Sequence, residues 1–117
     1  MPSVLIVDDH RRFRATARRW LTRAGFDVIG EAADGADALD SAARLRPDIV
    51  LLDVQLPDTS GFEIAARLTL NGEAPSVVVL TSTRDAAEFG DLIVQCGAAV
   101  FIPKAELSGP RLSVLLD

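Results

Sequence analysis

Short apolar runs alternate with segments of helical periodicity along the whole chain. The apolar runs predict five strands, at residues 3–8, 27–32, 48–53, 76–81 and 99–103. Apolar residues at helical spacing predict five helices, at residues 10–24, 34–45, from Ser60 onward, 86–96 and from Ser108 onward. Runs that are apolar on both faces and separated by helices indicate an α/β fold, with a parallel sheet covered on both sides.

Turn and capping residues mark the predicted helix ends. Gly25 and Pro47 are expected to end the first two helices. Ser60 followed by Glu63 matches a capping box at the start of the third helix, and Ser108 is expected to cap the last one. Gly90 falls inside the fourth helix. A glycine there destabilises a helix by roughly 1 kcal/mol relative to alanine, which predicts that this helix is only weakly stable.

Polar side chains follow the most apolar strands, where each strand ends. These residues are Asp8 and Asp9, Asp53, Thr81 and Ser82, and Lys104. In open parallel sheets, ligands bind beyond the carboxyl ends of the strands. If these strands are neighbours, three carboxylates, a hydroxyl and an ammonium group converge on one cleft.

Three carboxylates in one cleft repel one another and therefore need a cation. Ligands that are all oxygens suit Mg²⁺, which keeps some waters and binds a phosphate oxygen beside them. Lys104 is the only lysine, and its compact ammonium group suits a point contact to phosphate. The alternatives are that Asp8 and Asp9 cap the first helix and that Lys104 is a surface residue. His10, the only histidine, is expected in the first helical turn near the cleft mouth.

Composition and charge limit the classes of protein to consider. A length of 117 residues fits one domain spanning residues 1–117, and no apolar run approaches the roughly 18 residues that a membrane span needs. No signal peptide is visible, and the single cysteine, Cys96, suits a reducing cytoplasm. A net charge of −5 argues against direct nucleic-acid binding by this chain. Six of the eleven arginines lie between Arg11 and Arg23, either as a solvated helix face or as a docking surface for an acidic partner.

Four stretches in register resemble the receiver domain of two-component response regulators. They are VLIVDDH (4–10), PDIVLLDVQLPDTSG (47–61), VVVLTS (77–82) and GAAVFIPK (97–104). The resemblance covers essentially the whole chain and implies a flavodoxin-like, doubly wound sheet of five parallel strands in the order 2-1-3-4-5 with five helices. The stretch GEAADGADAL (30–39) further resembles receivers that are joined to a helix-turn-helix output domain.

The resemblance implies that Asp53 accepts a phosphoryl group and becomes an aspartyl phosphate. It implies a Mg²⁺ ion bound directly by Asp9, mainly through water by Asp8, by Asp53 itself, and by the backbone carbonyl of Gln55. A carboxylate nucleophile can form an acyl phosphate, and a metal ion and an ammonium group offset charge on the transferring group.

Three further residues match the family's switch positions. Thr81 would donate its hydroxyl hydrogen to the phosphoryl group, Lys104 would pair with another phosphoryl oxygen, and Phe101 would be the aromatic ring that rotates inward. Phe101 also fits as an ordinary core residue. The loop after the phosphoacceptor has Pro57 and Gly61 where the family's pattern expects them.

The chain departs from the common pattern of the family at several positions. Pro103 precedes Lys104, whereas many receivers have a proline after the lysine with a cis peptide bond between them, so that bond is not assumed here. Phe101 lacks the hydroxyl of the tyrosine often found there. Gln55 and Thr83 occupy the positions that tune phosphoryl lifetime, and neither is acidic, which predicts slower self-dephosphorylation than an acidic replacement of Thr83 would show.

As implied by the family, the partners are a sensor histidine kinase or phosphotransfer protein and a downstream target or output domain. The face formed by the fourth helix, the fifth strand and the fifth helix, within residues 86–116, would bind the target or form a homodimer. The chain would catalyse only its own phosphorylation and dephosphorylation. Both a stand-alone receiver and the receiver part of a transcriptional regulator remain open.

Three other functions compete with this one. A haloacid-dehalogenase-type enzyme uses a similar residue set but needs a second acid two residues after its nucleophile, where this chain has Gln55. A flavodoxin-like cofactor binder needs a phosphate-cradling loop after the first strand, where this chain has acids. A receiver that only binds partners would not need the complete set of acids, hydroxyl and lysine.

Overall fold

A five-stranded parallel sheet with helices on both faces organises the computed structural model, which describes residues 1–70, 75, 77–84, 86–97 and 100–114. Its strands are β1 (Ser3–Val7), β2 (Asp27–Ala32), β3 (Ile49–Asp53), β4 (Val77–Ser82) and β5 (Val100–Pro103). Their order is β2-β1-β3-β4-β5, and each neighbouring pair is parallel. The expected fold and strand order are therefore confirmed.

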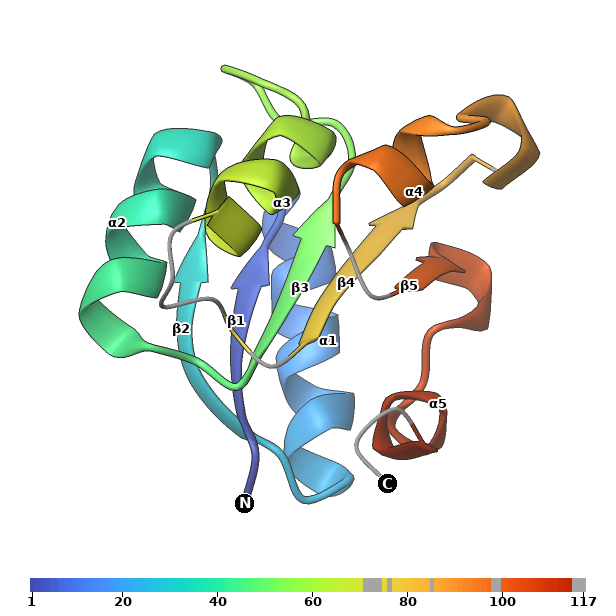
Figure 1. Cartoon of the computed structure of the whole chain (residues 1–117). Coiled ribbons are helices and arrows are strands. Elements are labelled where there is room, and N and C mark those ends of the chain that lie inside the picture. The colour runs from blue at the N-terminus through green and yellow to red at the C-terminus, as the bar shows by residue number, and fades with distance from the viewer. Residues whose placement is uncertain (71–74, 76, 85, 98–99, 115–117) are drawn as a thin grey trace.

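Helices cover both faces of this sheet (Figure 1). They are α1 (Arg11–Arg23), α2 (Gly35–Leu45), α3 (Gly61–Leu70), α4 (Leu92–Gln95) and α5 (Gly109–Val114), with 3₁₀ turns η1 (Ala86–Glu88) and η2 (Lys104–Glu106). In Figure 1, α2 and α3 lie in front of the sheet and α1 lies behind it. The layers leave the carboxyl ends of the strands free to carry a site.

Alternation along each strand divides the core into two layers. Leu5 and Val7 of β1 join the cluster that includes Ala38 of α2 and Ile64 of α3. The alternate strand residues, such as Ile6, join a second cluster with α1 and α5. Because successive strand side chains point to opposite faces, a strand that packs on helices at both faces needs apolar residues in succession, as at Val4–Val7 of β1 and Ile49–Leu52 of β3.

The capping predictions are confirmed at most helix ends. Gly25 has φ 93°, a left-handed conformation that glycine adopts at no steric cost, and α1 ends two residues earlier. Ser60 Oγ accepts the Glu63 backbone N–H at 3.2 Å, which is one half of the expected capping box. The Glu63 carboxylate instead accepts hydrogen bonds from Thr59 and Arg67. Ser108 Oγ caps α5 by accepting the backbone N–H of residue 111 at 3.1 Å.

The fourth helix was predicted as one element over residues 86–96, and this was wrong. The segment contains η1, then Gly90 with φ 56°, then the four-residue α4. A left-handed residue ends a right-handed helix, so Gly90 separates the two turns. In this segment Cys96 is buried and Phe89 packs on the core, whereas Leu92 is half-exposed.

Other boundaries shift by one or two residues. The first strand ends at Val7, although Asp8 N still donates to Ala32 O at 3.0 Å. His10 lies at the N-cap of α1 and not in its first turn. Residues 76, 99, 115 and 116, which the predicted strands and last helix included, lie outside the described residues.

Candidate functional site

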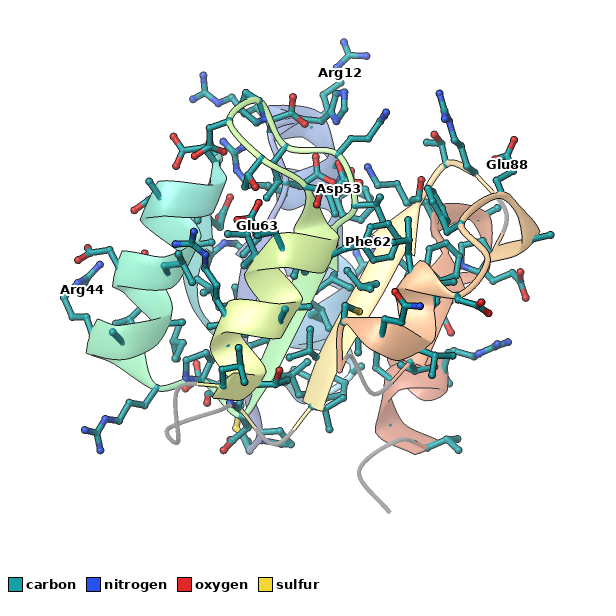
Figure 2. All side chains as sticks on the ribbon, turned by 45° about the horizontal axis from the view of Figure 1, so that its top comes forward. Arg12, Arg44, Asp53, Phe62, Glu63 and Glu88 are labelled. Atoms are coloured by element: carbon teal, nitrogen blue, oxygen red, sulfur yellow. The ribbon has the colours of Figure 1, made fainter. Side chains whose placement is uncertain are left out.

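Strand register brings the predicted acids and the hydroxyl to one edge of the sheet. Val7 of β1 pairs with Leu52 of β3, so the residue after Val7 lies level with Asp53. Asp53 in turn pairs with Thr81 of β4. Figure 2 shows Asp53 at the end of β3, beneath the loop that leads to α3.

Asp8 is the most enclosed of the three acids, with no exposed surface. Its Oδ1 accepts the His10 backbone N–H at 2.7 Å and lies 3.0 Å from His10 Nδ1. Its Oδ2 is buried without a hydrogen-bond partner of suitable geometry among the described residues. The compensating charge for this oxygen is the Lys104 ammonium group, at 2.8 Å. A buried carboxylate without such a partner would be costly, so the ion pair holds Lys104 at the site.

Lys104 lies between two carboxylates and an aromatic ring. Its Nζ is 2.8 Å from Asp8 Oδ2 and 3.7 Å from Asp53 Oδ2, and its side chain is 13% exposed. The same nitrogen lies 4.4 Å from the centroid of the Phe13 ring of α1, a cation–π contact. The apolar spacing of the first helix predicts that Phe13 faces the core, but it does not indicate this contact with the lysine.

Burial raises the pKa of the Asp53 carboxyl from 3.8 to about 6, and the neighbouring Asp8 charge adds to the effect. The Lys104 charge and the Gln55 backbone N–H act in the opposite direction without cancelling it. The folded protein therefore disfavours the ionised form of the Asp53 carboxyl. A cation near this group would reduce that cost and favour its ionised, nucleophilic form.

Ligand atoms of Asp8, Asp9, His10 and Asp53 all lie within 4.8 Å of one another. Three of these groups are carboxylates, which are the ligands that hard divalent ions prefer. The raised pKa of Asp53, to which the Asp8 charge contributes, indicates that Lys104 alone does not balance the negative charge here. The residues therefore fit a divalent cation. Gln55 lies exposed just beyond β3, in an isolated bridge with Ser60.

Thr81 of β4 and Phe101 of β5 belong to the two strands on the far side of β3 from β1. Thr81 is buried, and its Oγ1 donates a hydrogen bond to the Ile102 backbone carbonyl at 2.7 Å. Phe101 is half-buried and packs against Phe89, with ring centroids 5.6 Å apart. Phe89 also packs edge-on against Phe62 of α3 at 5.3 Å. Aromatic contacts thus connect β5 to the segment after β4 and to α3.

Gly61 lets α3 begin directly against the end of β3. Its backbone N–H donates to Val54 O at 2.6 Å. A Cβ at this position would overlap the Asp53 carbonyl oxygen and would crowd Val54 Cα at 2.9 Å. The small residue is therefore needed for the close approach that positions Asp53.

Asp58 joins the loop after β3 to α2, a contact that the sequence did not predict. Its carboxylate accepts the backbone N–H groups of Gly35 and Ala36, at 2.7 and 3.1 Å. These hydrogen bonds lower the pKa of Asp58. A loop residue thus caps a helix that precedes it in the chain. The sequence shows only an acidic residue in a predicted loop, and this does not indicate which backbone N–H groups its carboxylate accepts.

Part of the arginine cluster on α1 is already paired within the molecule. Arg14 and Arg18 contact the two Glu31 carboxylate oxygens at 3.1 and 2.7 Å. Burial raises the pKa of Glu31, but the hydrogen bonds and charges of these arginines outweigh it and hold the pKa below its usual value. Arg14 also donates to the Asp8 backbone carbonyl at 2.6 Å. These two arginines therefore support β1 and β2.

Among the described residues, no helix is long and apolar enough to cross a membrane.

Comparisons with known proteins agree with this geometry. The family model of the response regulator receiver domain matches residues 4–112. The chain is 41% identical over 106 residues to a Pseudomonas aeruginosa protein described as a transcriptional regulator, covering 91% of this chain and 51% of that protein. It is 39% identical over 103 residues to the Bordetella pertussis virulence regulator BvgA, covering 88% of this chain and 49% of BvgA. The chain thus spans about half the length of these two relatives.

Solved structures give the same result. The signal receiver domain of the response regulator NarL from Mycobacterium tuberculosis superposes with a TM-score of 0.87 at 35% identity, covering 99% of this chain and 94% of that one. The response regulator domain of Thermotoga maritima CheB superposes with a TM-score of 0.83 at 27% identity, covering 99% and 93%. Fold, strand-end residues and family match therefore lead to one conclusion: the chain belongs to the response regulator receiver domain family of two-component systems.

Proposed function

We propose that the chain, as one receiver domain over residues 1–117, is a signalling switch that accepts a phosphoryl group on Asp53 in a Mg²⁺-dependent reaction. The donor is a sensor histidine kinase or a phosphotransfer protein. The observation that carries the proposal is the buried Asp53 carboxylate, level with Asp8 and 3.7 Å from the Lys104 ammonium group. This arrangement combines a nucleophile with an ammonium group that can pair with an oxygen of the transferred phosphoryl group.

The transfer step needs little machinery beyond these residues. An Asp53 oxygen attacks the phosphorus of a phosphohistidine, the new P–O bond forms as the P–N bond breaks, and the electron pair leaves with the donor imidazole. Asp8, Asp9, Asp53 and the Gln55 carbonyl would hold Mg²⁺, which supplies positive charge to offset that of the transferring group. Lys104 would exchange part of its contact with Asp8 for a phosphoryl oxygen.

The switch would follow from the added charge of roughly −1.5 to −2 on Asp53. Thr81, whose hydroxyl now donates to Ile102 O, would turn to donate to the phosphoryl group. The segment after β4 would be drawn toward the site, and Phe101 would rotate inward. This is a shift between two populated states of the α4–β5–α5 face, where Val94 is 81% exposed and so available to a partner.

The downstream function of this receiver is inferred from its relatives and from its net charge. Because two relatives described as transcription regulators are about twice as long as the matched segment, we infer that this receiver serves as part of a transcriptional regulator. The alternative is a stand-alone receiver. It would bind a downstream protein or form a homodimer through the α4–β5–α5 face. The net charge of −5 disfavours direct DNA contact by this chain, and its location in the cytoplasm stays a prediction.

The chain is not proposed to turn over other substrates. Gln55 lies two residues after the nucleophile, where a dehalogenase-type phosphatase needs an acid. Release of more than one equivalent of phosphate from a phosphatase substrate would contradict this.

The proposal is tested by intact-mass analysis after incubation with a small-molecule phosphodonor and Mg²⁺. We expect one added phosphoryl group on the wild-type chain and none on Asp53→Asn or in excess chelator. Asp40→Asn, at an exposed position of α2, is the matched control and should be labelled like wild type. Failure to label wild type under conditions that label a known receiver would overturn the proposal.

A further inference from the structure

His10 is the one nitrogen-bearing residue in the cluster of candidate metal ligands. Its Nδ1 lies 3.0 Å from Asp8 Oδ1 and 3.2 Å from Asp9 Oδ1. The His10 side chain is 68% exposed and Asp9 is 38% exposed, whereas Asp8 is buried. The three groups therefore form a cup that is fixed at its base and open to solvent at its rim.

The spacing of these atoms is the spacing of ligands on one metal ion. Ligand atoms about 2.1 Å from an octahedral ion lie roughly 3 Å from their neighbours on that ion. The distances from His10 Nδ1 to the two carboxylate oxygens match this value. An ion could therefore contact all three atoms with small side-chain adjustments.

We propose that His10 is a further ligand of this metal site and gives it an affinity for divalent transition ions, such as Zn²⁺ and Co²⁺, that the carboxylates alone would not provide. The inference rests on the proposed metal site and adds a nitrogen ligand to it. Imidazole suits zinc, cobalt and nickel, whereas Mg²⁺ prefers oxygen and holds its waters. His10 would thus decide which divalent ions compete for the site.

Two contacts of Asp8 decide how His10 and an ion would meet at this acid. The His10 backbone N–H donates to Asp8 Oδ1 at 2.7 Å, which fixes the residue beside the buried acid. Lys104 occupies the other oxygen of Asp8, at 2.8 Å. The Oδ1 side, toward His10 and Asp9, is therefore the side from which an ion would approach. If His10 serves only as a hydrogen-bond donor to the acids, no ion will depend on its ring nitrogen.

The test uses the whole chain with Zn²⁺ alone as the probe. His10 is the only histidine, so its ¹⁵N ring signals are unambiguous, and the only cysteine, Cys96, is buried. Calorimetry would give Zn²⁺ and Mg²⁺ affinities for wild type, His10→Gln and Asp9→Asn. NMR would report whether the ring nitrogen signals move on Zn²⁺ addition.

We expect His10→Gln to weaken Zn²⁺ binding on the order of tenfold or more while Mg²⁺ affinity changes by less than about twofold. We also expect the His10 ¹⁵Nδ1 signal to move on Zn²⁺ addition to wild type, and this shift to be lost in Asp9→Asn. Equal Zn²⁺ affinity in wild type and His10→Gln, or a shift retained in Asp9→Asn, would overturn the inference. Mg²⁺ binding that persists in those cases would leave the proposed function intact, whereas a wild-type chain that binds neither ion would remove both.

Discussion

Lys104 Nζ lies 2.8 Å from Asp8 Oδ2, and this contact joins residues from opposite sides of the sheet centre. Asp8 follows β1 and Lys104 follows β5, while β3 and β4 lie between those two strands. The lysine therefore reaches across the ends of two strands, over Asp53, to compensate a carboxylate with no exposed surface. One ammonium group thus compensates the charges of two acids, and the first two predictions follow from this shared pairing.

Replacing Lys104 should destabilise the protein. In Lys104→Met, the buried Asp8 carboxylate loses the ammonium group beside its Oδ2, which we expect to lower the free energy of unfolding by about 3 kcal/mol at neutral pH without metal. Urea unfolding measures this change. The double variant Lys104→Met/Asp8→Asn should recover most of the loss, because no buried charge then remains unpaired. Simply additive losses would contradict the pairing.

Asp53→Asn should stabilise the protein in the absence of metal ions. The folded state raises the pKa of Asp53 from 3.8 to about 6, so it binds this proton more tightly than the unfolded state does. The stability from Asp53 is therefore lost as pH rises through 3.8 and then about 6, and it stays lost above that. At about pH 7 we expect the variant to be more stable by roughly 1–3 kcal/mol.

The measurement for this prediction is urea unfolding of both proteins with chelator, from about pH 4 to about pH 7. The variant's advantage should grow with pH and shrink when Mg²⁺ is added to wild type. An advantage that falls as pH rises would show that Asp53 is not held at an electrostatic cost.

Gly61→Ala should damage both stability and the site. The added Cβ meets the backbone of Asp53 and Val54, which cannot move aside as a flexible side chain would. We expect a loss of about 1–3 kcal/mol on urea unfolding, together with slower phosphorylation, because the phosphoacceptor is displaced. Gly25→Ala is the control: its Cβ meets nothing within 4 Å, so only the strain of its positive φ remains, and phosphorylation should stay at the wild-type rate.

Thr83→Glu should shorten the life of the phosphorylated form. Thr83 is exposed, two residues after Thr81, at a position that tunes self-dephosphorylation in the family. A carboxylate there can accept a proton from the attacking water, which the threonine hydroxyl does poorly. Phosphoryl loss followed by intact mass should be faster in Thr83→Glu than in Thr83→Gln, which matches its size without the charge. Equal or slower loss would refute this role.

Local patterns in the sequence determined the sheet, all but the fourth of its helices and the residues at the strand ends. Strand side chains alternate with a period of two and helix side chains with a period of 3.6, so burial on both faces is readable from the order of apolar residues alone. Asp8, Asp53 and Thr81 could be placed at one edge because parallel strands end on the same side. The resemblance to receivers then supplied the strand order.

Only the tertiary structure decided how these groups are paired. Lys104 contacts Asp8 and the ring of Phe13, Asp58 caps α2, and Thr81 donates to β5. Each of these contacts joins segments far apart in the chain, and no periodic pattern specifies such a partner. The break at Gly90 was predicted wrongly as continuous helix, because a helical pattern and a glycine make opposing local predictions there. Packing of the whole chain, through burial and charge compensation, settles such choices.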